Sequence, residues 1–384
     1  ENFKVNGGIG VISSRLLVQG PLQKEKGSFI VSGRTSYAHL FLKLADNKNS
    51  AMFYDFNAKF NYRFNANNTL TFSGYLGNDV FDINDRFSSK YGNTMGILSW
   101  KHKFSDRLNS NLSTFYSDYK FNLGLSTENF EWDSNIQNYG LKYGWNYQKS
   151  EKFKINYGIE GLYYNFNPGT VQPTSIDSQF NYKQLDKKYA LETSAYLDFE
   201  NQITEKLNFR YGLRYSMFYR LGSEAISTYE NGQSVVYNPL YKIYEEGTPT
   251  GSVYYGKGKK ISSFDNFEPR AALSYAFNDN TSVKASYNRM AQYIHILSNT
   301  QSPLPMSIWT PSGPFTKPQL LDQYAMGYFK NFRDNDYSFE GELFYKNVQN
   351  RIDYIDGADI LANNNIEQVI LNGKARSYGM ELLF

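Results

Sequence analysis

The sequence contains no cysteine, only three histidines and no long apolar run. Without cysteine, the 384-residue chain can form neither disulfides nor thiolate metal sites. No stretch of about eighteen apolar residues occurs, so the sequence predicts no membrane-spanning helix. At Glu1 no basic segment precedes an apolar one, and the sequence therefore predicts no signal peptide there.

Strong charge of one sign and clustered catalytic side chains are also missing. The net charge of +3 is too balanced for a nucleic-acid partner. The histidines fall on three separate predicted strands, which does not indicate a triad or a zinc site. No helical pattern follows the early glycines, so they do not predict a phosphate loop. We therefore expect no enzyme, no catalytic residues and no cofactor from these residues: His39, His102, His295, Gly7, Gly8 and Gly10.

Aromatic residues, in contrast, make up 17% of the chain, with 34 tyrosines and 29 phenylalanines. In the segment from Ala190 to Arg220, apolar and polar residues alternate on either side of a short polar stretch. A period of two predicts strands, and two such arms around a polar turn predict an antiparallel hairpin. Each arm is long enough to cross a bilayer as a tilted strand.

The hairpin pattern recurs along the whole chain and predicts about fifteen strands. The first runs from Gly8 to Gln19, a later one from Phe29 to Leu42, and the last from Ser377 to Phe384. Short turns such as Asn65–Asn68 alternate with long polar segments, namely Asn78–Asn93, Asn122–Ile136, Asn167–Lys188, Leu221–Asp265, Leu297–Leu320 and Arg351–Arg376.

This sorting of connections by length separates two fold classes. Short periplasmic turns and long extracellular loops are typical of outer-membrane barrels, whereas a soluble, aromatic-rich sandwich has no reason to sort its loops by end. The sequence therefore predicts an all-β, transmembrane, antiparallel up-and-down β-barrel. Its polar strand positions are expected to face the lumen, among them Arg210, Arg214, Glu192, Asp198, Glu340 and Glu342.

The predicted extracellular loops carry the candidate ligand-binding residues. Proline stiffens a loop, and the proline-rich segment 297–320 surrounds Trp309 and Phe315. The loop 221–265 contributes tyrosines for stacking on a sugar or siderophore, or for packing on a partner protein: Tyr237, Tyr241, Tyr244 and Tyr254. For both loops, a purely structural role as a rigid cap is the alternative.

One acidic segment is a weak calcium candidate. Asp79, Asp82 and Asp85, with Asn84, offer oxygen ligands in one expected loop. The spacing matches no known calcium loop and lacks a bidentate glutamate, so a solvated loop without metal is the simpler interpretation.

The segment Phe267–Thr300 (FEPRAALSYAFNDNTSVKASYNRMAQYIHILSNT) resembles TonB-dependent outer-membrane receptors of Bacteroidetes type. So do PLPMSIW at Pro303–Trp309 and KPQLLDQYAMGYFKNF at Lys317–Phe332. The opening segments Gly7–Pro21 and Gly27–Leu42 resemble the early strands that follow the plug of such receptors.

The resemblance implies a barrel of 22 strands around an N-terminal plug. On this basis, residues 1–384 are expected to form a single partial β-barrel domain that lacks the plug and the last strands. With fifteen strands, the two edge strands would run parallel, so we also expect no direct closure.

The function implied is TonB-dependent uptake of a scarce or large ligand, a siderophore, cobalamin, glycan or peptide, across the outer membrane of a Gram-negative bacterium. Expected partners are outer-membrane lipid, the TonB complex through the plug, and a surface lipoprotein, with no nucleic acid. A passive porin-like channel is the alternative function.

Overall fold

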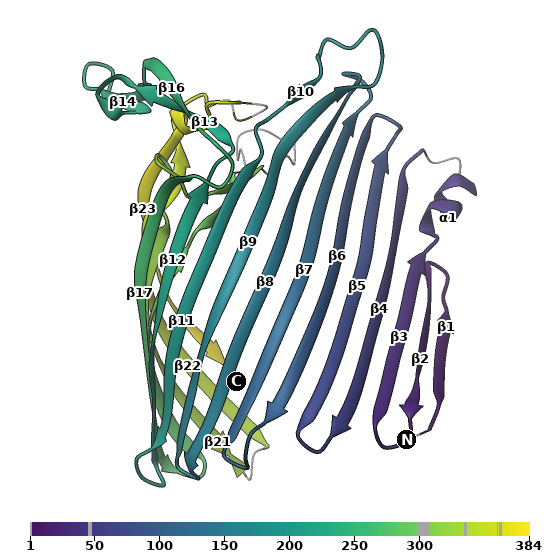
Figure 1. Ribbon diagram of the computed structural model, residues 1–384, viewed down its shortest axis with the longest axis vertical. Coiled ribbons are helices and arrows are strands. Elements are labelled where there is room, and N and C mark those ends of the chain that lie inside the picture. Colours follow the sequence, from purple (N-terminus) through teal and green to yellow (C-terminus); the bar gives the residue numbers. More distant parts are fainter. Residues whose placement is uncertain (1, 45–47, 298–307, 334–335, 359, 361–362) are drawn as a thin grey trace.

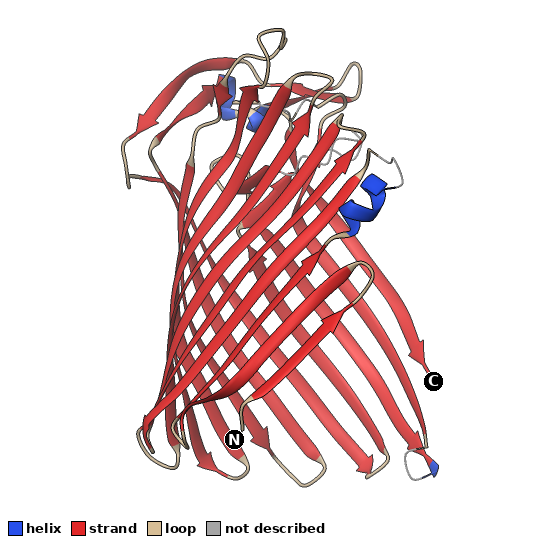
Figure 2. Cartoon of the chain, turned by 90° about the vertical axis from the view of Figure 1, so that its right-hand side faces the viewer, coloured by secondary structure: helices blue, strands red, loops and turns tan. Residues whose placement is uncertain are grey.

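A computed structural model describes residues 2–44, 48–297, 308–333, 336–358, 360 and 363–384. Seventeen strands of this part form one antiparallel sheet, which curls into a barrel that is open along one side (Figures 1 and 2). Apart from the two-residue strand β10, the strands follow one another in chain order, each paired with its predecessor. The predicted all-β antiparallel barrel fold is confirmed.

The strands of the sheet are β1 (Lys4–Ile9), β2 (Ser13–Gln23), β3 (Gly27–Ser36), β4 (Ser50–Asn65), β5 (Asn68–Ile83), β6 (Phe87–Lys103), β7 (Leu108–Leu125), β8 (Phe130–Ser150), β9 (Phe153–Pro173), β10 (Lys183–Gln184), β11 (Lys188–Gln202), β12 (Leu207–Leu221), β17 (Lys260–Asn278), β18 (Thr281–Gln292), β21 (Gln319–Phe332), β22 (Tyr337–Tyr354) and β23 (Ile370–Leu383).

The connections at one end of the barrel contain the remaining elements. They are α1 (Ala38–Leu44), β13 (Glu224–Tyr229), β14 (Val235–Asn238), β15 (Ile243–Glu246), β16 (Pro249–Tyr255), β19 (Ile294–Leu297), β20 (Ile308–Pro311) and two short 3-10 turns, η1 (Glu230–Gly232) and η3 (Ile366–Gln368). The pairs β13–β16, β14–β15 and β19–β20 form separate two-stranded sheets. No helix in the described ranges is long and apolar enough to cross a membrane.

The central strands are longer than expected, and two segments predicted as loops are strands instead. Residues 78–93 and 122–136 belong almost entirely to strand pairs, joined by tight turns at 84–86 and 126–129. Asn84 and Asp85 adopt positive φ of 52° and 56°, which suits short polar side chains in a tight hairpin turn. Polar composition indicated loops here because these strand ends lie beyond the apolar belt.

The beginning of the chain also differs from the prediction. A turn at residues 10–12 divides the expected strand Gly8–Gln19 between β1 and β2. The expected strand Phe29–Leu42 ends at Ser36, and α1 follows it. The alternating pattern did not reveal this turn or this helix, because Gly10 and the apolar residues of 38–44 continue the composition of the neighbouring strands.

The last strand and the number of strands both differ from the prediction, and both bear on how the barrel could close. β23 extends from Ile370 to Leu383, so the expected short arm at Ser377–Phe384 is wrong. Without β10, sixteen strands follow one another, not fifteen, and β1 and β23 therefore run antiparallel. The expected parallel relationship of the edge strands is wrong. In the described part, β1 pairs only with β2 and β23 only with β22.

The outward face of the sheet is apolar strand after strand. On β8, β9 and β22, Leu141, Ile159 and Leu343 are 55–56% exposed. Near the short turns, Phe153, Phe199, Tyr211 and Phe209 form a row of rings 4.8–6.1 Å apart. An apolar band bounded by aromatic rings is the surface that an outer-membrane barrel presents to lipid.

Candidate functional site

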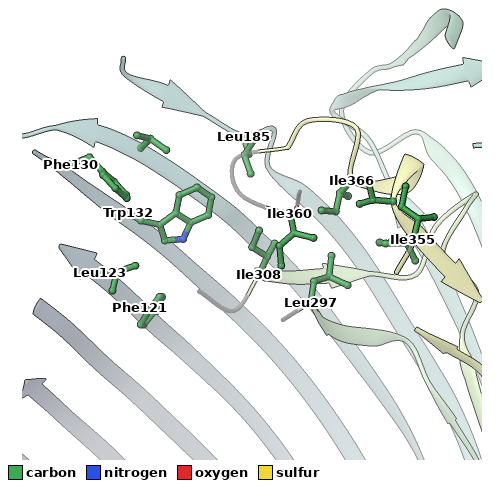
Figure 3. Close-up of a cluster of buried hydrophobic side chains, with 13 residues drawn as sticks. Phe121, Leu123, Phe130, Trp132, Leu185, Leu297, Ile308, Ile355, Ile360 and Ile366 are labelled. Atoms are coloured by element: carbon green, nitrogen blue, oxygen red, sulfur yellow. The ribbon is translucent and has the colours of Figure 1, made fainter. Parts of the chain in front are cut away.

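The long connections fold inward at the barrel mouth and build a core there. A cluster of thirteen buried residues joins the inward faces of β7, β8 and β9 to the segments around β19, β20 and 355–370 (Figure 3). Trp132 is fully buried in it, and the ring fits because Gly169 has no side chain. The extracellular connections are thus held against the inner wall by apolar burial.

A second cluster holds the β19–β20 hairpin to the neighbouring part of the wall, on β8, β9, β11 and β12. The ring of Trp309 packs against this cluster, which includes Phe218 and Tyr293. Lys188 Nζ, at the start of β11, also donates to Thr310 Oγ1 of this hairpin at 3.2 Å. The predicted ligand-contacting residue Trp309 is therefore half-buried in a packing contact. Residues 298–307 of the predicted proline-rich loop, including Pro303 and Pro305, lie outside the described residues.

Beside the first cluster lies a cavity of about 320 Å³, and Phe315 is part of its lining. Its wall combines the end of β12, the start of β13, β20 and residues 363–367. Charged side chains line it although they are almost completely shielded from solvent. Arg220 is 3% exposed and Glu224 is 5% exposed, and the two form an ion pair. We call this space the mouth cavity.

The electrostatics of the mouth cavity combine both signs of charge. Burial raises the pKa of the Glu224 carboxyl, and the neighbouring cations Arg220 and Lys188 oppose that shift. Tyr229 donates from its hydroxyl to Glu367 Oε1 at 2.9 Å, and burial also raises the pKa of this tyrosine. Such a site can bind a polar ligand that carries both donors and acceptors.

An aromatic contact fixes the remaining wall of the cavity. The rings of Tyr229 and Phe315 meet edge to face with centroids 5.2 Å apart. The Phe315 carbonyl accepts a hydrogen bond from Asn372 Nδ2 at 2.9 Å. Of the six predicted loop residues, Phe315 is the one that the structure places in this cavity.

The four predicted tyrosines lie elsewhere, on the hairpins that protrude from the mouth (Figure 1). Tyr237 and Tyr244 are cross-strand partners on β14 and β15, with ring centroids 5.2 Å apart. Tyr241 and Tyr254 are both 68% exposed. The structure thus separates these tyrosines from Trp309 and Phe315.

The predicted lumen residues share the inward face of the sheet. Arg214 is the centre of a group in which its guanidinium lies 3.0 Å from Glu160, 3.4 Å from Glu192 and 3.9 Å from Glu268. Asp198 pairs with Arg270 at 3.4 Å, and Arg210 with Glu200 at 3.7 Å.

Two further predicted residues lie nearer the short turns. Glu342 shares a cavity of about 610 Å³ with Arg210. Glu340 lies on β22, two residues before Glu342 and on the same face.

The calcium candidate and the histidines are dispersed. Asp79 and Asp82 point to opposite faces of β5, and Asp85 lies in the following turn. His39 lies on α1 rather than on a strand, while His102 is on β6 and His295 on β19. Across the described ranges, no three metal-binding side chains of the His, Cys, Asp or Glu type gather.

Four charged residues of the mouth cavity were not predicted from the sequence: Lys188, Arg220, Glu224 and Glu367. Arg220 belongs to the same set of alternate positions on β12 as Arg210 and Arg214, so the sequence predicts that it faces inward. Its ion-pair partner Glu224 is only four residues away, but Glu367 and Phe315 reach the same cavity from distant connections, which the alternation does not encode.

Comparisons with known proteins agree with this architecture. The family model "TonB dependent receptor-like, beta-barrel" matches residues 36–384. A search among curated proteins found no match. Many solved structures are similar to this chain.

Three of these structures are outer-membrane receptors. The alcaligin receptor FauA from Bordetella pertussis is 13% identical with a TM-score of 0.61, covering 98% of this chain and 57% of that one. The Serratia marcescens hemophore receptor HasR, in complex with HasA and heme, is 13% identical with a TM-score of 0.66, covering 99% and 60%. The ferric preacinetobactin receptor BauA from Acinetobacter baumannii is 13% identical with a TM-score of 0.64, covering 100% and 59%.

The chain thus spans less than two thirds of the length of these receptors. Their low identity supports the fold, whereas the family match extends over nearly the whole chain. The chain belongs to the TonB-dependent receptor-like β-barrel family, whose members are outer-membrane proteins of Gram-negative bacteria.

Proposed function

We propose that this barrel takes part in TonB-dependent uptake of a scarce or large ligand. The observation that carries the proposal is the mouth cavity, where a shielded ion pair and the Phe315 ring face a space of about 320 Å³ inside a receptor-family barrel.

The cavity lining supports the proposed classes of ligand. Arg220 and Lys188 suit acidic oxygens, Glu224 and Glu367 suit donors, and Phe315 suits a flat apolar group. A siderophore, cobalamin, glycan or peptide combines such features. The similar solved structures include receptors for alcaligin, for ferric preacinetobactin and for a heme-carrying hemophore.

The partners and the domain organisation form part of the same proposal. Residues 1–384 constitute a single partial barrel domain, in keeping with the one-sided pairing of β1 and β23. A plug domain occupies the lumen and couples it to the TonB complex, and outer-membrane lipid surrounds the apolar belt. A surface lipoprotein is a further proposed partner, for which the exposed tyrosine hairpins offer a surface.

Uptake by cells that express the full-length gene tests the proposal. The probes are labelled ferric siderophores, cyanocobalamin, an oligosaccharide and a peptide, each supplied with and without functional TonB. We expect saturable uptake of one probe, lost without TonB and weakened more by Phe315→Ala than by the exposed control Tyr182→Ala.

Two outcomes contradict the proposal in different ways. Non-saturable uptake that persists without TonB indicates the alternative, a passive porin-like channel. TonB-dependent uptake that Phe315→Ala leaves unchanged refutes the mouth cavity as the capture site.

A further inference from the structure

Four tyrosines form a continuous row on the outward face of the barrel, on the side of the long connections. Their ring centroids are 5.1, 6.4 and 6.5 Å apart along the series. Aromatic rings of this kind lie at the membrane–water interface of outer-membrane barrels. The row therefore marks the outer surface of the membrane, and it consists of Tyr116, Tyr139, Tyr163 and Tyr189.

A polar groove begins immediately above this row. Asp118, Gln137 and Asn165 each lie two residues from a row tyrosine on the same face of β7, β8 and β9, a rise of roughly 7 Å. They line a cavity of about 530 Å³ that extends across β5 to β9. We call it the headgroup groove, because its height is that of the lipid headgroups.

The carboxylates of the headgroup groove already have hydrogen-bond donors. Asn135 Nδ2 donates to Asp118 Oδ1 at 3.1 Å, and Gln137 Nε2 approaches Asp118 Oδ2 at 3.4 Å. Asn122 Nδ2 donates to Asp133 Oδ1 at 2.8 Å. These contacts occupy carboxylate oxygens and fix the amide side chains in place, while the charge of Asp118 is offset by a lysine of the groove rim.

Three amide oxygens in the same groove have no donor. Within the described part of the chain, Oδ1 of Asn122, Asn165 and Asn167 is buried and makes no hydrogen bond. Buried acceptors of this kind cost free energy unless a donor reaches them. Sugar hydroxyl groups are suitable donors because one ring presents several of them in a fixed arrangement.

The headgroup groove also has a cationic rim. Lys90, Lys120 and Lys187 line it and are exposed. The side chain of Lys120 is 68% exposed, and its ammonium lies 3.5 Å from Asp118. Lysine ammonium groups bind phosphate as point charges.

We propose that the headgroup groove binds the phosphorylated sugar headgroup of a glycolipid in the outer leaflet. The outer leaflet of a Gram-negative outer membrane consists largely of such lipid. The lysines contact the phosphate, the asparagine oxygens accept from the sugar hydroxyls, and the acyl chains lie along the apolar belt below the tyrosine row. This site is on the opposite face of the sheet from the mouth cavity, and it is independent of the imported ligand.

The test measures binding of purified lipopolysaccharide to the full-length protein in detergent. The variant Lys90→Gln/Lys120→Gln/Lys187→Gln removes the cationic rim. Its matched control, Lys24→Gln/Lys26→Gln/Lys149→Gln, removes three charges near the short turns. We expect the rim variant to bind lipopolysaccharide about tenfold to a hundredfold more weakly, the control to bind normally, and salt to weaken binding to the unmodified protein.

A second variant separates sugar recognition from simple charge attraction. Asn165→Leu/Asn167→Leu should weaken lipopolysaccharide binding while leaving the weak attraction to phosphatidylglycerol vesicles unchanged. Equal binding by the rim variant and its control overturns the proposal, as does phosphatidylglycerol binding as tight as that of lipopolysaccharide. Heat-modifiable migration shows whether each variant folds. If a variant does not fold, the salt response of the unmodified protein is the test: lipopolysaccharide binding that salt leaves unchanged overturns the proposal.

Discussion

Phe218 and Tyr293 stack with ring centroids 4.8 Å apart and ring planes 1° from parallel. Phe218 belongs to the inward face of β12, and Tyr293 links β18 to the hairpin that fills the mouth. The Tyr293 hydroxyl also contacts Ser216 Oγ at 2.7 Å and accepts from Asn266 Nδ2 at 2.8 Å. One residue thus ties the mouth hairpin to two barrel strands.

Loss of this stack should release the hairpin without unfolding the barrel. We expect Phe218→Ala to cost about 3–5 kcal/mol of local stability, because a fully buried ring is deleted. Protease accessibility of β19–β20 in the refolded protein should rise. The outward-facing control Tyr219→Ala should leave that accessibility unchanged, and an equal rise in both would refute the anchoring role.

Gly169 provides space that no other residue can supply. A Cβ atom at this position would lie 1.8 Å from Cζ2 of Trp132. We expect Gly169→Ala to destabilise the protein by about 1–3 kcal/mol through overpacking. Gly161→Ala on the same strand, where nothing lies within 4 Å of the added carbon, is the matched control. Thermal midpoints of the heat-modifiable band compare the two variants.

The mouth hairpin should loosen in acid because of His295. Gln319 Nε2 lies 3.2 Å from His295 Nδ1, and His295 Nε2 lies 2.9 Å from Ser312 Oγ. Burial lowers the pKa of His295 to about 4 from an ordinary 6.5. The exposed imidazole of an opened hairpin takes up a proton near pH 6.5, whereas the buried one does so only near pH 4.

The closed hairpin is therefore fully stable above pH 6.5, and it loses stability as the pH falls from 6.5 towards 4. We expect greater protease sensitivity of the hairpin at pH 5 than at pH 7.5. His295→Gln should flatten this dependence. If His295→Gln retains the full pH response, groups other than His295 cause that response.

The two faces of β12 should respond differently to substitution. Leu213 is 42% exposed on the lipid-facing side, so Leu213→Arg should impair folding into bilayers by about 2–4 kcal/mol at the midplane. The lumen position Arg214 would be expected to tolerate Ser if it faced only water. Its contacts with three glutamates argue otherwise.

We expect Arg214→Ser to cost about 1–3 kcal/mol, because the carboxylates lose their shared cation. Adding Glu192→Gln should restore part of that loss, since it removes one of the repelling charges. Urea unfolding of the refolded protein in lipid vesicles measures the stability of Leu213→Arg, Arg214→Ser and Arg214→Ser/Glu192→Gln. Failure of the second substitution to restore any stability would show that the loss is not electrostatic.

The ion pair of the mouth cavity gives a similar test outside the membrane. Arg220→Met leaves Glu224 buried without its partner, which should cost about 3–5 kcal/mol. In the double variant Arg220→Met/Glu224→Met both charges are absent, and most of the stability should return. If the double variant is as unstable as the single one, packing rather than charge explains the loss.

The alternation of residues predicted the strands and their two faces because it is a local property. The positions of Leu213 and Arg214 follow from a period of two, whatever the rest of the chain does. The heights of the strands could not be predicted in the same way. Asn122, Asn135 and Gln137 resemble loop residues in composition, yet they lie in a continuous ladder above the membrane.

The mouth cavity was only partly predictable for a different reason. Phe315 was singled out by the prolines around it, which is a local signal. Lys188 and Arg220 lie on the neighbouring strands β11 and β12, and Glu367 reaches them from the distant connection before β23. No spacing along the chain encodes such a meeting, because the lengths of the connections do not determine their path.

Strands β8 and β9 each contain 21 residues, about twice the 9–11 that cross a bilayer. Their upper halves therefore stand on the cell surface as a paired wall. An antibody that recognises this wall must read side chains from several strands at once. Linear peptides copied from residues 130–140 should therefore be poor immunogens against intact cells, while the folded barrel should elicit antibodies that fail on denatured blots.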